Sequence, residues 1–359
     1  MKTDETKKYQ KLKKSLSPSK IVWPILLGFG VAAWLLFGDI NADSFSFFEW
    51  SLSAVFWIFI SLLMMVLRDV AYMWRLRILT HKKLKWYDSF QVIMLWEFSS
   101  AVSPSVVGGT GPAIYFLYKE GLNIGRSTAV VLTAIFLDEL FFIIMVPLMV
   151  LFFGFMAFPQ EGSALLNNMQ LYFWMAYSLI LIYTILLAYA LFINPYTIKK
   201  LLSYIFLLPF LRRWRGKVRK LGNQLIITSK VFKEQRIGFW LKSFFATFIS
   251  WTARYWVINF IFLAFFSQAI GWYENFLIYA RQLSMWILLL ISPTPGGSGI
   301  AEYIFTDFLG DIIPNLEWAV PLAILWRLIS YYPYLFIGAV VLPRWLRKVF
   351  ETKKELHER

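Results

Sequence analysis

Long apolar stretches, separated by short charged segments, run through almost the whole chain. A helix that crosses a membrane needs about 20 consecutive apolar residues. The full-length apolar stretches cover about residues 21–38, 50–67, 126–158, 169–193, 239–267 and 318–342. This pattern predicts an all-α, polytopic transmembrane helix bundle, with a single transmembrane domain over about 21–345.

Two further apolar stretches, at about 88–107 and 274–292, each run into a cluster of Pro and Gly. Basic residues favour the cytoplasmic loops of membrane proteins. Most of the 36 Lys and Arg residues lie in segments that we therefore place in the cytoplasm: 1–20, 68–85, Lys119 with Arg126, 199–236 and 344–359. Acidic segments without Lys or Arg are expected outside: 39–49, 158–168, 268–276 and 301–317.

Under this topology each interrupted stretch has both flanks on one face of the membrane, so we predict two re-entrant broken-helix hairpins. The alternative for the first is a full span at 88–107, followed by a short second one at 112–118.

The stretch at 21–38 follows a Lys-rich segment, as in a signal peptide, but it is too long and lacks a clear cleavage site. We interpret it as an uncleaved span.

The termini and the central basic segment complete the predicted organisation. Residues 1–20 form a basic N-terminus, 195–237 a basic linker and 346–359 a tail, all in the cytoplasm. The expected location is the inner (cytoplasmic) membrane, in multi-pass form.

The two interruptions share a motif, which consists of Ser-Pro, a short spacer and Gly-Gly-Ser/Thr-Gly. The copies run from Ser103 to Gly111 and from Ser292 to Gly299, about 189 residues apart. Spans flank both copies, and the predicted topology of the second half is opposite to that of the first. We therefore predict two inverted repeats, at about 50–158 and 239–342, with a site near the bilayer midplane.

The amino-acid composition excludes several classes of partner and site. The chain is 59% hydrophobic and only 16% charged, whereas soluble proteins carry about 25% charged residues. Its net charge of +15 is explained by cytoplasmic loops, so we expect no nucleic-acid partner. There is no Cys, and the two His, His81 and His357, lie in charged flanks. We therefore expect no metal site, no cofactor and no catalytic residue.

Charged residues within the predicted spans and hairpins are the candidates for function, because each costs roughly 2.5–3.5 kcal/mol at a helix centre. The first half of the chain carries three such acids, Glu97, Asp138 and Glu139. The second half carries three such bases, Arg254, Arg281 and Arg327. Asp138 and Arg327 are separated by the repeat offset, so we hypothesise that they pair, directly or through a substrate. The alternative is ion pairing that only holds helices together.

In the functional interpretation the three arginines bind an anionic headgroup, since the guanidinium fork suits phosphate. The acids then balance charge or accept protons, and the helix N-termini after the motifs add N–H groups. The other candidate substrate-binding residues belong to the motifs: Ser103, Pro104, Gly108, Gly109, Thr110, Gly111, Ser292, Pro293, Gly296, Gly297, Ser298 and Gly299. Their hydroxyls could equally satisfy local backbone groups.

These motifs resemble the flippase-like membrane domain of lysylphosphatidylglycerol synthases and its stand-alone bacterial and archaeal members. The resemblance covers about residues 20–345, although the spacer of the first motif is longer than that of the second. The residues behind it are Arg68 to Leu79, both motifs, Lys119 to Asn123, Leu137-Asp138 and Trp326-Arg327. It implies an inner-membrane protein that moves or binds lipids. The synthases add a large soluble domain, and only a short tail follows Arg344, so we expect no aminoacyl transfer.

The leading hypothesis is a lipid translocase that binds an anionic phospholipid or a lipid-linked phosphate in a midplane cavity. The alternatives are a secondary transporter of a small solute or ion, a membrane-embedded enzyme, and a membrane partner of a separate lipid-modifying enzyme. For the last, residues 199–236 would be the docking platform. Within them, Arg212 to Phe232 is either an interfacial helix or a plain basic loop. A homo-oligomer remains open.

Overall fold

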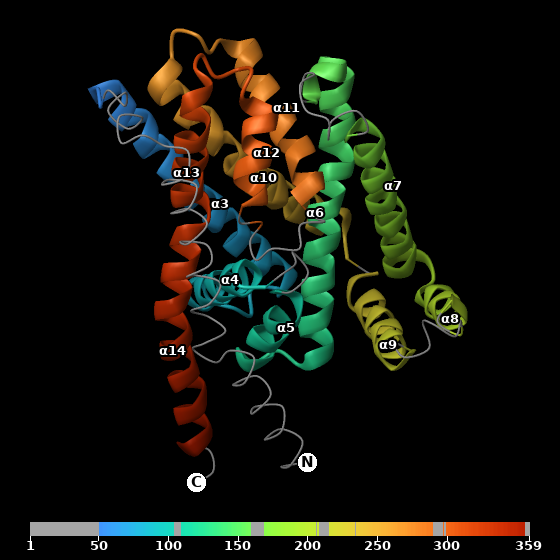
Figure 1. The fold of residues 1–359 in the computed structure, drawn as a ribbon. Coiled ribbons are helices and arrows are strands. Elements are labelled where there is room, and N and C mark those ends of the chain that lie inside the picture. The colour runs from blue at the N-terminus through green and yellow to red at the C-terminus, as the bar shows by residue number, and fades with distance from the viewer. Residues whose placement is uncertain are drawn as a thin grey trace.

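The computed structural model describes residues 50–103, 109–158, 169–205, 207, 215–233, 235–289, 297 and 299–355. Within these residues the chain is helical and contains no strand, which confirms the predicted all-α class (Figure 1). The predicted first span at 21–38, the N-terminal segment 1–20 and the motif interiors at 104–108 and 290–296 lie outside the described residues.

Five helical segments of the described chain are long and apolar enough to cross a membrane. They are α3 (Leu52–Leu79), α6 (Ile124–Phe153), α7 (Met169–Ala188), α10 (Ile237–Phe266) and the pair α13 (Ala319–Ser330) and α14 (Tyr332–Glu355). They correspond to five of the six predicted spans, and the chain is a polytopic membrane bundle.

Helix α3 is longer than the apolar pattern predicts. Ser51 caps its N-terminus by accepting a hydrogen bond from the Ala54 N–H, and the helix continues to Leu79. The prediction of a loop from residue 68 is therefore wrong over the first twelve residues, and the cytoplasmic location of this segment stays a prediction. The reason is a buried face, since Tyr72, Leu76 and Leu79 continue the core side of the helix beyond the apolar stretch.

The last predicted span, 318–342, also differs from the prediction of one continuous helix, because it consists of the two helices α13 and α14. Tyr331 ends α13 with φ −127° and ψ −55°, and its N–H bonds to the Arg327 carbonyl. Pro333 then lies in the first turn of α14, where its missing N–H costs no helical hydrogen bond.

Each motif separates a longer helix from one of ten residues. The first lies between α4 (Trp86–Ala101) and α5 (Thr110–Lys119), and the second between α11 (Trp272–Leu289) and α12 (Ile300–Leu309). In Figure 1, α4 and α5 lie toward the end of the bundle where α14 ends, and α11 lies toward the opposite end. The re-entrant course of these segments and the inverted symmetry of the halves stay predictions.

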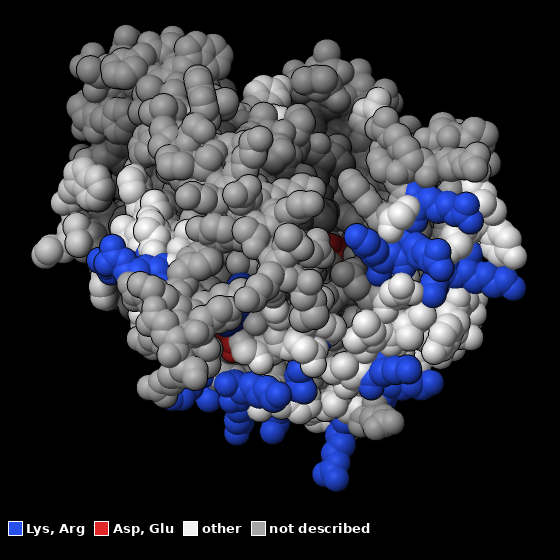
Figure 2. Space-filling model, turned by 90° about the horizontal axis from the view of Figure 1, so that it is seen from below, with Lys and Arg blue, Asp and Glu red and all other residues white. Residues whose placement is uncertain are grey.

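The basic linker forms two helices, α8 (Pro195–Ile205) and α9 (Arg215–Phe232). Phe232 is buried and the Ser229 hydroxyl donates to the Leu191 carbonyl, so α9 is fastened to the bundle. Figure 2 shows Lys and Arg spread over the lower face of the molecule, with very few acidic residues among the described atoms.

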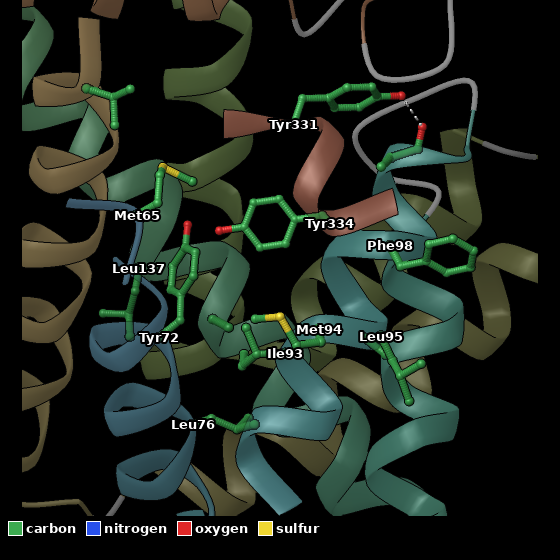
Figure 3. Packing of buried hydrophobic residues seen from close by; sticks show 14 of the residues in the cluster. Met65, Tyr72, Leu76, Ile93, Met94, Leu95, Phe98, Leu137, Tyr331 and Tyr334 are labelled. Atoms are coloured by element: carbon green, nitrogen blue, oxygen red, sulfur yellow. Dashed lines mark hydrogen bonds between the residues drawn. The ribbon is translucent and has the colours of Figure 1, made fainter. Parts of the chain in front are cut away.

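The larger core cluster draws its buried residues from helices that include α3, α4, α5, α6, α10, α12, α13 and α14. Met65, Tyr72 and Leu76 of α3 face Ile93 and Met94 of α4 (Figure 3). This apolar packing surrounds the charged residues described next and fixes their positions.

Candidate functional site

A cluster of charged side chains, which we call the central network, is buried in this core. Its first arginine is Arg68 on α3, whose guanidinium lies 2.9 Å from the carboxylate of Asp69 and 2.7 Å from that of Glu97 on α4. The Tyr334 hydroxyl of α14 donates to Asp69 over 2.8 Å. Three helices are thereby joined through one guanidinium.

The second arginine of the central network, Arg75, lies two turns further along α3. It makes a bidentate pair with Asp138 of α6, with contacts of 2.5 and 3.2 Å, and also donates to the Thr247 hydroxyl of α10. The Trp251 indole N–H donates to the same carboxylate over 2.7 Å. Asp138 is about 21 Å along a helix of about 45 Å, at 1.5 Å per residue, so this pair lies near the middle of α6.

Aromatic rings separate the two arginines of the network. The Tyr72 ring lies 4.6 Å from both the Arg68 and the Arg75 guanidinium, and the Tyr334 ring lies 4.9 Å from that of Arg68. Figure 3 shows Tyr72 and Tyr334 extending toward each other from α3 and α14. Such cation–π contacts stabilise a desolvated guanidinium without neutralising it.

The two signs of charge differ in accessibility. The side chains of Arg68 and Arg75 are only 1% and 6% exposed, whereas those of Asp69, Glu97 and Asp138 are 20%, 23% and 20% exposed. The arginines thus lie behind the carboxylates. Anything that approaches the network meets the carboxylates first.

Arg254 differs from the other arginines of the bundle. It is half-buried near the middle of α10 and makes no ion pair with any described carboxylate. Its guanidinium lies 5.7 Å from the ring of Trp251, one turn earlier, and it attracts the charge of Glu97. Arg254 therefore borders the central network, and within the described part of the chain its charge is not neutralised by an ion pair.

Glu139, next to Asp138, lies outside the network. Its Oε2 is buried and accepts no hydrogen bond from the described residues, and its electrostatic neighbours are the adjacent Asp138 and Tyr183 of α7. Consecutive residues of a helix point about 100° apart, which explains why only Asp138 reaches Arg75.

The other two predicted arginines belong to what we call the second-half pairs. Arg281 of α11 forms an ion pair with Asp311, and it also donates to the Phe308 carbonyl over 2.8 Å and to the Met156 carbonyl over 2.9 Å. Its donors are thus largely engaged by the ends of α12 and α6.

Arg327 of α13 completes the second-half pairs, with its guanidinium 3.3 Å from the carboxylate of Glu302. The other oxygen of Glu302 accepts the Gly299 N–H over 2.7 Å, at the start of α12. Gly299 has φ +83°, a conformation that side-chain-bearing residues rarely adopt. Glu302, predicted in an external acidic loop, is instead buried.

The prediction of a direct ion pair between Asp138 and Arg327 is therefore wrong. Arg75 reaches Asp138 because α3 is helical through residue 79, and Glu302 reaches Arg327 because residues 300–309 form a helix. A connection between Asp138 and Arg327 through a substrate stays a prediction.

The motif residues can be placed only in part. Pro104, Gly108, Ser292, Pro293, Gly296 and Ser298 lie outside the described residues. The Ser103 hydroxyl donates to the Ser99 carbonyl, as the local alternative predicts. A Cβ on Gly109 would come within 2.1 Å of the Ser100 Oγ, so α5 begins close against the end of α4. Gly111 has open space around it, and Thr110 begins α5.

Sequence reasoning missed Arg68 and Arg75 because their charge favoured a loop. A signal was present, since Arg68, Tyr72, Arg75 and Leu79 recur at spacings of four, three and four, which places them on one helical face. Asp69, Glu302 and Asp311 had no such signal, because single acids near a span are also typical of loops.

Comparisons with known proteins agree with this architecture. Residues 21–338 match the family described as "Lysylphosphatidylglycerol synthase TM region". A "UPF0104 membrane protein" of Archaeoglobus fulgidus is 25% identical over 268 residues, which are 72% of this chain and 76% of the relative. No solved structure matches the chain. The family match covers most of the chain, so this multi-pass membrane protein belongs to the family of the lysylphosphatidylglycerol synthase transmembrane region.

Proposed function

We propose that the protein moves lipid headgroups across the membrane past the central network, with Arg254 as the contact for the anionic phosphate. The observation behind this proposal is an arginine in the middle of α10 that makes no ion pair with a described carboxylate. A charge at that depth costs roughly 2.5–3.5 kcal/mol, and such residues mark substrate pathways. A phosphate would supply the missing partner in a geometry that guanidinium favours.

The family supports a lipid as the substrate, because its description names the transmembrane region of a lipid synthase. The central network supplies carboxylates that are partly accessible and held by side chains rather than by backbone. Such pairs can exchange partners as a headgroup passes. Movement of this kind involves binding without covalent chemistry.

Arg281 and Arg327 have a structural role in this proposal. Their guanidiniums are buried, and each already has an acidic partner. A headgroup would have to displace those partners and, at Arg281, two backbone carbonyls. Arg254 needs no such displacement.

We place the basic lower face of the molecule in the cytoplasm, by the positive-inside rule. Helix α9, which lies toward the lower end of the molecule in Figure 1, carries exposed basic residues that include Arg219 and Lys220, and the α3–α4 connection carries the exposed Lys82 and Lys83. The proposed setting is the cytoplasmic membrane, with both termini on the basic side.

Leaflet exchange in proteoliposomes tests the proposal. Fluorescent phosphatidylglycerol and phosphatidylcholine would be reconstituted with the protein, and exchange followed by quenching the outer leaflet. Arg254→Gln is expected to slow exchange at least tenfold. Lys242→Gln, which removes an exposed charge from the same helix, is the matched control and should leave the rate unchanged. Equal rates in all three proteins, or no exchange by the unmodified protein, would contradict the proposal.

The accessible carboxylates favour one alternative, a secondary transporter that binds a small cation at Asp69, Glu97 and Asp138. Uptake of small amines and alkali cations into the same vesicles separates the two functions. Cation uptake without lipid exchange would support the transporter.

A further inference from the structure

Four consecutive contacts between described residues connect Gly299, the last residue of the second motif, with Ala101, which lies two residues before the first motif. The Gly299 N–H donates to Glu302 over 2.7 Å, and the other Glu302 oxygen lies 3.3 Å from Arg327. The Arg327 guanidinium lies 3.8 Å from the Tyr331 ring centroid. The Tyr331 hydroxyl then donates to the Ala101 carbonyl over 3.1 Å, a bond drawn as a dashed line in Figure 3.

Each end of this connection satisfies a backbone group that a helix end leaves without a helical partner. Ala101 is the last residue of α4, and the last four carbonyls of a helix have no donor within the helix. Gly299 precedes the first turn of α12, where N–H groups have no intrahelical acceptor. The contacts therefore lie at the two points where the helices break.

The middle of the connection follows one helix, α13, and the residue that ends it. Arg327 and Tyr331 are four residues apart, so they lie on one face of α13 and stack directly. Tyr331 is also the residue at which α13 gives way to α14. A movement of α12 that shifts Glu302 would act on α13, and through Tyr331 on the end of α4.

We propose that Tyr331 couples the start of α12 to the end of α4, so that a movement at the start of α12 loosens the close contact between the end of α4 and the start of α5. Tyr331 acts as a positioning residue through Arg327 and Ala101, without contacting a substrate. The coupling holds whether or not the protein moves lipid, because it depends only on contacts within the chain.

The chain has no cysteine, which allows a direct test in the full-length protein. A single cysteine at Gly111 reports on the first break, since that position is exposed and a Cβ there meets nothing within 4 Å. The rate of its reaction with N-ethylmaleimide would be measured in purified protein. Glu302→Gln at the second break and Tyr331→Phe are each expected to raise this rate about fivefold or more, in the range of typical coupling energies.

Two matched controls separate coupling from general loosening. Asp311→Asn removes an acidic partner from the other second-half pair. Tyr177→Phe removes a hydroxyl that donates to a helix carbonyl over the same 3.1 Å, between α7 and α6. Both should leave the labelling rate within twofold of the parent. Folding of every variant would be checked by thermal denaturation.

The combination of Glu302→Gln with Tyr331→Phe should raise the rate no further than the larger single effect, because both act on one connection. Phenylalanine keeps the ring under Arg327, so this variant is expected to fold even if Glu302→Gln is unstable. An unchanged rate in Tyr331→Phe, or an equal rise in the two controls, would overturn the proposal.

Discussion

The central network and the second-half pairs bury similar charges in different ways. In the central network, Arg68 and Arg75 bond to side chains from other helices. In the second-half pairs, Arg281 bonds to two backbone carbonyls as well as a carboxylate, and Glu302 holds a backbone N–H. One set joins side chains to side chains, and the other joins side chains to helix ends.

This difference separates the residues that we expect to contact a substrate from those that only hold helix ends in place. A helix end has backbone groups that need a partner, so an arginine bound to it is fixed as long as the helix ends there. A carboxylate that is paired only with side chains can rotate and accept another cation or donor. The partly accessible central network is therefore the place where a passing headgroup can exchange contacts.

The largest effect is expected from removing one member of the bidentate pair. Arg75→Met leaves the mostly enclosed Asp138 carboxylate without its cation, and breaking a fully buried pair costs about 3–5 kcal/mol, so we expect a loss toward the lower end of this range. The free energy of unfolding would be measured by SDS titration in mixed micelles. The double variant Arg75→Met with Asp138→Leu should recover much of the loss, because no charge is then left unpaired. A double variant that is as unstable as the single one would show that other contacts dominate.

The spans could be predicted because a 20-residue apolar stretch in a chain of this composition has few alternatives. The ten-residue helices α5 and α12 were less certain, since they are too short for a span. Their starts were nevertheless marked by the Gly-rich motifs, which end at Gly111 and Gly299.

The partners of the charges could not be predicted in the same way. Arg75 and Asp138 are 63 residues apart, and Arg281 and Asp311 are 30 apart. The packing of the helices therefore decides which carboxylate pairs with which arginine. The repeat offset suggested Asp138 with Arg327, but an offset relates positions by symmetry and does not bring them into contact. Helices α3 and α12 supplied the actual partners of Asp138 and Arg327.

A smaller effect is expected from substitution of Arg281, which should change the free energy of unfolding but not leaflet exchange. Lysine keeps the charge but cannot serve Asp311 and two carbonyls in one plane. Arg281→Lys should lower the free energy of unfolding by about 1–3 kcal/mol, while leaflet exchange per folded protein stays the same. Arg254→Lys is the counterpart, with stability retained and exchange reduced. A loss of exchange in Arg281→Lys at full stability would place this residue in the pathway and remove the distinction between the two sets.

The smallest effect is expected at Glu139, which is adjacent to Asp138 but takes no part in either set. Glutamine has nearly the same shape and removes a charge that has no cationic partner among the described residues. Glu139→Gln should therefore change the free energy of unfolding by less than about 1 kcal/mol, in either direction. Asp138→Asn is the matched control, and it should be clearly less stable because the charge that Arg75 and Trp251 share is lost. Equal losses in the two variants would mean that Glu139 belongs to the central network, and that the network extends across α6 toward α7.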